Sequence, residues 1–363
     1  MDIEKGLKDF SDKNYSRFFM PGHKGRAFEG CRGFEEFYKT DVTELPETDS
    51  LFLPESYIKT ASEKLRKIFK SSESIYLTNG STGGVMAMIY GSFEEGDRVI
   101  VDKNCHTSVI NAINLKRLEP LYIYGENLEE FGIYGEISAE NIEEIFKKNE
   151  KIKGVILTSP NYFGICHNIA EISGVCKKNN ALLLVDEAHG AHFYFSRHLP
   201  ETSMEQGADA CNVSLHKTLP CPNQTAVLNI RNQSLISRIK DALMFFHTTS
   251  PSYPLLAMAD SAVQHLYGDT SKIDRFILKL KKRIGETRLE KVKLLDADDV
   301  AKITVNVSAL GTNARECQKL LKEKFGLICE MRFGDNLLFM TSFMNTDEEI
   351  DRLFEGIHYL EEN

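Results

Sequence analysis

Residues 181–217 read ALLLVDEAHGAHFYFSRHLPETSMEQGADACNVSLHK, two short apolar runs joined by a longer segment. The first run ends in Asp186, and the second ends in His216 and Lys217. Runs of this kind are typical of strands that are buried on both faces of a parallel sheet. A carboxylate and a lysine are costly to desolvate, so their position at the strand ends calls for a chemical reason.

The same pattern extends over residues 56–231. SYIKTASEKLRKIFK (56–70) has its apolar residues at helical spacing. Most of the apolar runs are separated by a helix-length segment: SIYLT, DRVIVD, PLYIY, KGVILTSP, ALLLVDE and ADACNVSLH. This alternation predicts an α/β fold, with a mostly parallel sheet covered by helices on both faces. Ligands of such sheets bind at the carboxyl ends of the strands, so the residues after each run are the candidates for chemistry.

The character of the sequence changes after residue 231. Three helical segments follow, and a shorter α/β pattern of strands and helices completes the chain. We therefore expect an N-terminal arm (1–50), a large domain (51–250), and bridging helices with a smaller C-terminal α/β domain (251–363).

Composition excludes several classes of protein. The 363 residues carry a formal net charge of −9 without a basic stripe, which argues against nucleic acid and anionic membranes as partners. No apolar run reaches the ~18–20 residues of a membrane helix, and the charged N-terminus does not resemble a secretion signal. The eight cysteines are scattered and form no C-x-x-C motif, which indicates reduced thiols, no metal site and a cytoplasmic protein.

A glycine-rich turn, NGSTGG (79–84), follows the run SIYLT and precedes an apolar helix. Gly80 allows close backbone approach, Ser81 and Thr82 add hydroxyl donors, and a helix start exposes free N–H groups. The turn could hold a phosphate. It could equally be an ordinary turn in which Ser or Thr caps the helix. It matches neither the Walker motif nor G-x-G-x-x-G.

Three further strand ends carry polar side chains. His106 follows DRVIVD and could stack on a planar ligand, although a lone histidine there is more often structural. Asp186 needs a cationic or N–H partner if it is buried, unless it caps a helix. His189 lies three residues further on and could serve the same ligand.

Lys217 follows Ser214 and His216 at the end of the last run. Partial burial lowers the pKa of a lysine and leaves a neutral amine that can attack a carbonyl, whereas most lysines simply lie on the surface. A phosphate cradle, a stacking ring, a buried carboxylate and a reactive lysine are together what pyridoxal 5′-phosphate (PLP) requires.

Seven short segments of the chain are similar in sequence to motifs of one family, and they occur in the same order along the chain. They are FFMPGHKG (18–25), DVTELPETDSLFLP (41–54), LTNGSTGGVMAMI (77–89), NCHTS (104–108), VDEAHGAH (185–192), SLHKTLP (214–220) and TTSPSYPLLA (248–257). The sequence thus resembles the Orn/Lys/Arg decarboxylase group of fold-type I PLP enzymes, which have an aspartate aminotransferase-like fold.

The resemblance implies roles for the matching residues. Lys217 resembles the Schiff-base lysine, Asp186 the partner of the pyridine nitrogen, and His106 the ring that stacks on the cofactor. His189 resembles a residue that contacts the cofactor ring or orients Lys217. The residues that resemble phosphate contacts are Ser81, Thr82, Ser214 and His216, beside Gly80.

The substrate contacts are less defined by the resemblance. Glu330 could meet a distal cation of the substrate, and Arg332 could clamp a carboxylate or could simply be exposed on a strand edge. Ser250 belongs to a segment that resembles one approaching the site, including that of a neighbouring subunit. His23 and Lys24 could line the substrate entrance or shape the N-terminal arm.

The resemblance implies PLP-dependent decarboxylation of a basic α-amino acid (lysine, ornithine or arginine) in amino-acid metabolism and polyamine biosynthesis. It also implies a homodimer or higher homo-oligomer with the site at the interface. The alternatives are another PLP reaction, namely transamination, aldol cleavage or β-elimination, or a PLP-binding paralogue without catalysis.

Overall fold

The structure is a computed structural model that describes residues 2–13, 15–17, 19–27 and 33–362. Phe18, the first residue of the string FFMPGHKG, lies outside the described residues.

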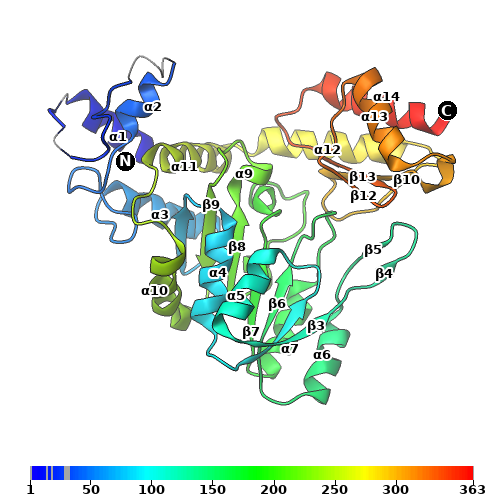
Figure 1. The fold of residues 1–363 in the computed structure, drawn as a ribbon, viewed down its shortest axis with the longest axis horizontal. Coiled ribbons are helices and arrows are strands. Elements are labelled where there is room, and N and C mark those ends of the chain that lie inside the picture. The colour runs from blue at the N-terminus through cyan, green and yellow to red at the C-terminus, as the bar shows by residue number, and fades with distance from the viewer. Residues whose placement is uncertain (1, 14, 18, 28–32, 363) are drawn as a thin grey trace.

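A seven-stranded sheet forms the centre of the molecule, in the order β1-β9-β8-β7-β6-β2-β3 (Figure 1). Its strands are β1 (Glu73–Leu77), β2 (Arg98–Asp102), β3 (Glu119–Ile123), β6 (Ile152–Thr158), β7 (Leu182–Asp186), β8 (Ala210–Ser214) and β9 (Ala226–Ile230). Six strands run in one direction, and β9 is antiparallel to both of its neighbours. The expected mostly parallel sheet is confirmed, and the sequence pattern had not singled out β9.

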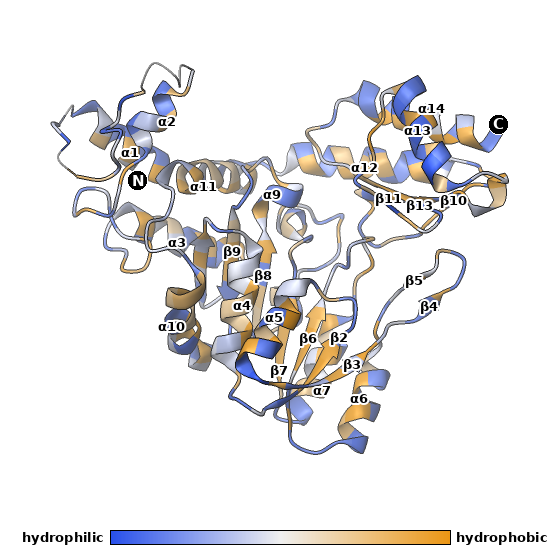
Figure 2. Ribbon diagram, viewed as in Figure 1, coloured by the Kyte–Doolittle hydropathy of each residue, from blue (hydrophilic) through white to orange (hydrophobic). Residues whose placement is uncertain are grey.

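Helices cover both faces of this sheet. One face packs on α4 (Ser81–Ser92), α5 (Thr107–Lys116) and α10 (Ile236–Phe246). The other face packs on α3 (Tyr57–Ile68), α6 (Ala139–Lys148), α7 (Ile169–Lys178), α8 (Ser203–Gln206) and α11 (Tyr253–Gly268). The strands are apolar along both faces, as Figure 2 shows. Successive residues of a strand therefore enter different cores, so Leu184 faces α4 and Val185 faces the opposite layer.

A second, four-stranded antiparallel sheet lies in the C-terminal region, in the order β10-β11-β13-β12. Its strands are β10 (Lys293–Leu294), β11 (Lys302–Asn306), β12 (Met331–Phe333) and β13 (Asn336–Met340), packed on α13 (Ala314–Phe325) and α14 (Asp347–Glu362). Helix α12 (Ser271–Glu286) places Ile277 in the core of the large sheet and Leu280 in that of the small one. The division into an arm (1–50), a large domain (51–250) and a C-terminal part (251–363) stays a prediction.

Two N-terminal helices and a hairpin lie at the periphery of the molecule. The N-terminal helix α1 (Ile3–Asp12) packs on α11, and α2 (Glu35–Thr40) lies nearby (Figure 1). The hairpin β4 (Asn127–Leu128) and β5 (Ile133–Tyr134) extends towards the four-stranded sheet. There Asn306 Nδ2 donates to Glu130 O at 3.2 Å and Asn336 Nδ2 to Phe131 O at 2.6 Å. The remaining short elements are α9 (Leu215–Thr218), η2 (Ala191–Phe195), η3 (Gln233–Leu235) and η4 (Ser308–Leu310).

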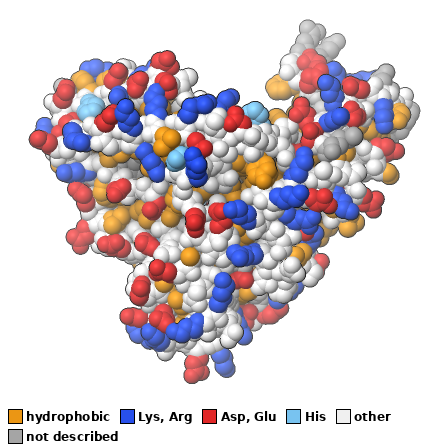
Figure 3. Space-filling view, turned by 180° about the vertical axis from the view of Figure 1, so that it is seen from behind, with side chains coloured by type: hydrophobic (Ala, Val, Ile, Leu, Met, Phe, Trp, Pro, Cys, Tyr) orange, Lys and Arg blue, Asp and Glu red, His pale blue; other side chains and the backbone are white. Residues whose placement is uncertain are grey.

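The surface mixes charges of both signs. Figure 3 shows acidic and basic side chains interspersed over the face seen from behind. Among the described residues, no helix combines the length and the apolar character that crossing a bilayer demands.

Candidate active site

Three polar side chains lie in one row across the carboxyl ends of the central strands. Thr158 on β6, Asp186 on β7 and Asn212 on β8 are paired in register. They share the face that packs on α4 and α5, because residues two positions earlier belong to that core. All three are buried. Within the described part of the chain, Thr158 Oγ1 and Asn212 Oδ1 have no hydrogen-bond partner.

Asp186 is the charged member of this row. Its Oδ1 accepts from the backbone N–H of Ala188 at 3.2 Å. Burial raises the pKa of Asp186, while the positive charge of Lys217 opposes that shift. A cationic N–H group placed in the site would therefore stabilise the ionised carboxylate.

Lys217 projects from α9, directly after β8, and is half-buried. Its Nζ lies 2.9 Å from Nε2 of His189. Burial lowers the pKa of Lys217, although Asp186 acts in the opposite direction. Burial and nearby positive charges hold the pKa of His189 well below its usual value. The pair therefore brings an amine with a lowered pKa against a neutral imidazole.

The ring of His189 is fixed on its other side by Tyr162, whose ring centroid lies 4.8 Å away in an edge-to-face contact. His189 Nδ1 is buried and has no partner within the described residues. Sequence analysis did not identify Tyr162 as a site residue, because a tyrosine in a loop after a strand carries no signal of its own.

The glycine-rich turn lies at the start of α4, next to this row. Gly80 precedes the helix with φ +82°, and an added Cβ there would meet nothing within 4 Å. No side chain caps the helix, so its first N–H groups stay available to an anion. Ser81 Oγ accepts from Asn212 Nδ2, and from Ser214 Oγ at 2.9 Å. This geometry favours the phosphate interpretation over simple capping.

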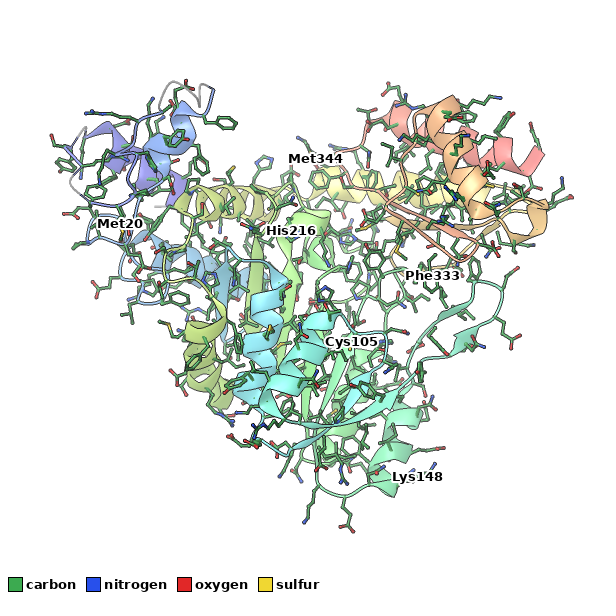
Figure 4. The ribbon with its side chains drawn as sticks, in the orientation of Figure 1. Met20, Cys105, Lys148, His216, Phe333 and Met344 are labelled. Carbon is green, nitrogen blue, oxygen red and sulfur yellow. The ribbon has the colours of Figure 1, made fainter. Side chains whose placement is uncertain are left out.

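Three other predicted cofactor contacts surround the cradle. Thr82 is exposed at the first turn of α4. His216 lies at the top of the sheet, where Figure 4 labels it, with Nδ1 3.0 Å from Thr225 O. His106 is exposed and precedes α5, where Nδ1 lies 3.1 Å from the backbone N of Ser108. It is near enough for its charge to influence the pKa of Asp186.

The predicted substrate contacts divide into two groups. Glu330 Oε1 accepts from the hydroxyl of Tyr162 at 2.7 Å, and the charge of Glu330 influences the pKa of Lys217. Glu330 is therefore part of the same site. Arg332 is exposed on β12, opposite Leu337, and within the described residues its side chain makes no hydrogen bond or ion pair. That position agrees with an exposed residue on a strand edge.

Ser250 is not brought to Lys217. It lines a pocket of about 420 Å³ with Met20, which Figure 4 shows on the N-terminal arm, away from His216. His23 is tied into the same arm, with Nε2 3.1 Å from Asp41 Oδ2. Lys24 adopts φ +56° in this turn. The structure thus places His23 and Lys24 in the arm rather than beside Lys217.

The donor set fits PLP. The turn at α4 offers free N–H groups and hydroxyls to a phosphate, Asp186 is a buried carboxylate without a strong partner, and Lys217 presents an amine with a lowered pKa. The model of the Orn/Lys/Arg decarboxylase major domain matches residues 3–314 of the chain. The chain belongs to the Orn/Lys/Arg decarboxylase family. Enzymes of this family are PLP-dependent lyases of fold type I.

Similar proteins carry names from this family. The arginine decarboxylase of Halalkalibacterium halodurans is 29% identical over 375 residues, which cover 98% of this chain and 76% of that protein. The uncharacterized protein YaaO of Bacillus subtilis is 34% identical over 272 residues, or 73% of this chain and 57% of that protein. The crystal structure of the Francisella novicida lysine decarboxylase LdcF has the same fold, with a TM-score of 0.82 at 23% identity. This chain spans 60% of its length.

Proposed function

We propose that this protein decarboxylates a basic α-amino acid, namely lysine, ornithine or arginine, with PLP as its cofactor. The observation that carries the proposal is the contact of Lys217 with His189 at 2.9 Å, beside the buried Asp186 and the phosphate cradle of α4. The names of the relatives, arginine decarboxylase and lysine decarboxylase, support this substrate class.

The cofactor contacts follow from the donors. PLP, when bound, supplies an aldehyde that condenses with amines and a pyridine ring that accepts electrons from a breaking bond. Lys217 would hold the aldehyde carbon, and Asp186 would keep a proton on the pyridine nitrogen. The ring of His106 would cover one face of the cofactor. The phosphate would be held by the N–H groups that follow Gly80 and by Ser81, Thr82, Ser214 and His216.

Proton movement would be confined to a short path. Lys217 and His189 lie within hydrogen-bonding distance, so a proton at Nζ can pass to Nε2 without crossing bulk water. Tyr162 packs against the imidazole and holds it in that position. Lys217 would return the proton to the substrate carbon that loses CO2.

Recognition of the substrate would use the C-terminal region. Glu330 presents a carboxylate near Lys217, oriented by the hydroxyl of Tyr162. A carboxylate in this place would attract an ammonium or guanidinium group at the far end of the substrate. This selects basic amino acids over neutral ones of similar length.

We also propose a homodimer or a larger homo-oligomer, with the site at the subunit interface. Ser250 belongs to a segment that we expect to approach the active site, but its pocket with the N-terminal arm does not include Lys217 of the same chain. A second subunit would bring this segment to Lys217, and this supports the proposal. A cytoplasmic location is supported by the cysteines: the seven that the structure describes are all free.

The test is incubation of the purified protein and PLP with lysine, ornithine or arginine, with amine products identified by mass and CO2 measured in parallel. We expect one of the three to yield its amine. Formation of a keto acid without CO2 would assign the site to transamination instead. Absence of any product, with PLP bound to Lys217, would leave a binding protein without catalysis.

A further inference from the structure

A second lysine, buried more completely than Lys217, lies close to the active site and belongs to the small sheet. Lys302 begins β11, and its side chain is only 1% exposed. Its Nζ lies 3.1 Å from Asp299 Oδ2 and 3.5 Å from the carbonyl oxygen of His189. A lysine buried this completely is retained only with partners, because an uncompensated ammonium is costly to desolvate.

Asp299 connects Lys302 to two loops of the large sheet. Its Oδ1 lies 2.9 Å from Nε2 of His192, and its backbone N–H donates to Gly164 O at 2.9 Å. Burial alone would raise the pKa of Asp299, but the charges of His192 and Lys302 outweigh burial and lower it. The carboxylate is therefore ionised, and it ties the start of β11 to the loops that follow β6 and β7.

His189 stands between the two lysines. Its carbonyl oxygen faces Lys302 and its ring nitrogen faces Lys217. After burial, the positive charge of Lys302 contributes to the lowered pKa of His189. Lys302 also acts on Lys217 in the same direction as burial. A change at Lys302 therefore affects the amine of Lys217 in two ways: through the position of His189 and through the charge of Lys302 itself.

We propose that Lys302 is a positioning residue of the active site: held by Asp299, which His192 binds in turn, it fixes the loop of His189 so that the imidazole stays against the amine of Lys217. The proposal rests on the proposed function only in taking Lys217 as the residue that holds the cofactor. The groups that face Lys217 are Asp186 from β7, His189 from the next loop, Lys302 from β11, and Glu330 before β12.

The test uses the apoprotein, so that it does not depend on catalysis. Reductive methylation modifies only neutral amines, and its rate at each lysine is measured over pH by peptide mass spectrometry. In the wild type, Lys217 should react at lower pH than Lys148, an exposed lysine labelled in Figure 4. The double variant Asp299→Asn/Lys302→Met removes both charges of this pair and keeps a side-chain oxygen at position 299 for His192, so it should fold better than a variant that removes one charge alone.

We expect methylation of Lys217 at pH 8 to be at least about threefold slower in the double variant. Of the two charges that it removes, Lys302 is the one that lowers the pKa of Lys217, so this pKa should rise. The single variant Lys302→Arg, which keeps the charge, should retain most of the wild-type rate. The control Lys279→Met removes an exposed pair with Asp347 on the C-terminal region and should leave the rate unchanged.

Equal rates at Lys217 in the wild type and the double variant would overturn the proposal and leave Lys302 with a purely structural role. So would a wild-type Lys217 that titrates together with Lys148, a result that needs no variant to fold. The outcome is separable from the proposed function: a protein that releases no CO2 can still show the expected methylation rates, and an active decarboxylase can fail to show them.

Discussion

Asp186 and Glu187 are neighbours in the chain but lie on opposite faces of the central sheet. Asp186 shares its face with Thr158 and Asn212, at the start of α4 and α5. Glu187 faces the other layer, where Oε1 accepts from Ser203 and Oε2 accepts from the hydroxyl of Tyr194 at 2.6 Å. Both carboxyl groups are buried. Asp186 accepts one hydrogen bond from the protein and can accept more from a ligand, whereas both oxygens of Glu187 already accept hydrogen bonds from the protein.

Substitution of the two carboxyl groups should therefore separate chemistry from folding. We expect Asp186→Asn to lower kcat roughly 10²–10⁴-fold, because an amide cannot hold a proton on a pyridine nitrogen. Its unfolding temperature should stay close to that of the wild type or rise. Glu187→Gln should keep most of the activity at neutral pH. CO2 release and thermal unfolding of both variants check this, and equal losses of activity would contradict the assignment of the two faces.

Glu187 should also make stability depend on pH. Burial raises its pKa from the usual 4.5 to about 7. The protonated form suits the buried site, so the stabilisation is fully present below pH 4.5 and is lost as the pH rises through about 7. Loss of this contribution should cost the wild type roughly 3 kcal/mol between pH 4.5 and pH 8.

Glu187→Gln lacks this titration and should gain stability relative to the wild type as the pH rises. Urea unfolding at pH 5 and pH 8 measures the difference. The control is Glu144→Gln, which changes an exposed carboxylate on α6 and should keep the wild-type pH dependence. A Glu187→Gln variant that loses as much stability as the wild type between the two pH values would refute the raised pKa.

The glycine before α4 should matter for the cofactor as well as for the backbone. Gly80 has φ +82° and ψ 170°, a conformation that other residues adopt at a cost of about 1–3 kcal/mol. Gly80→Ala should therefore lower stability by that amount and weaken PLP binding about tenfold or more, since it disturbs the cradle. Gly96, also at φ +82° with open space around it, provides the control. Gly96→Ala should cost stability while its PLP affinity, measured by absorbance titration, stays unchanged.

Removal of the proposed cation contact should change substrate selection. Glu330→Gln should raise KM for the basic amino acid about tenfold or more while kcat changes less, because the distal cation is bound equally before and during the reaction. Tyr162→Phe removes the hydroxyl that orients Glu330 and should have a smaller effect of the same kind. Glu323→Gln on α13 makes the same charge change away from the site and should leave KM unaltered. A fall in kcat alone in Glu330→Gln would assign this carboxylate to the chemistry instead.

The sequence predicted the sheet and the group around Lys217 because both have local signals: apolar runs of strand length, and polar residues where those runs end. Strand β9 is also an apolar run, AVLNI, but only the short helix α9 and a turn separate it from β8, so it does not follow the alternation of strands with long helices. Thr158 and Asn212 were missed because their position beside Asp186 depends on the register of three strands. That register is a long-range property of packing.

Lys302 was missed for a similar reason, although a weak signal exists. AKITVNV alternates Lys302, Thr304 and Asn306 with apolar residues, as expected of a strand with one polar face. Alternation of this kind usually means that the polar face meets water. Here that face is buried: Lys302 meets Asp299 and the carbonyl oxygen of His189, and Asn306 meets the backbone of the hairpin. The identity of the surface across from a strand is not encoded in the strand.

The hairpin of β4 and β5 is held through its backbone oxygens at Glu130 and Phe131, and the amides that bind them belong to Asn306 and Asn336. A carbonyl oxygen is the same whatever side chain follows it. Side chains at the tip of the hairpin can therefore vary widely, except at Gly132, whose φ of +61° favours glycine, whereas the two asparagines should tolerate little change.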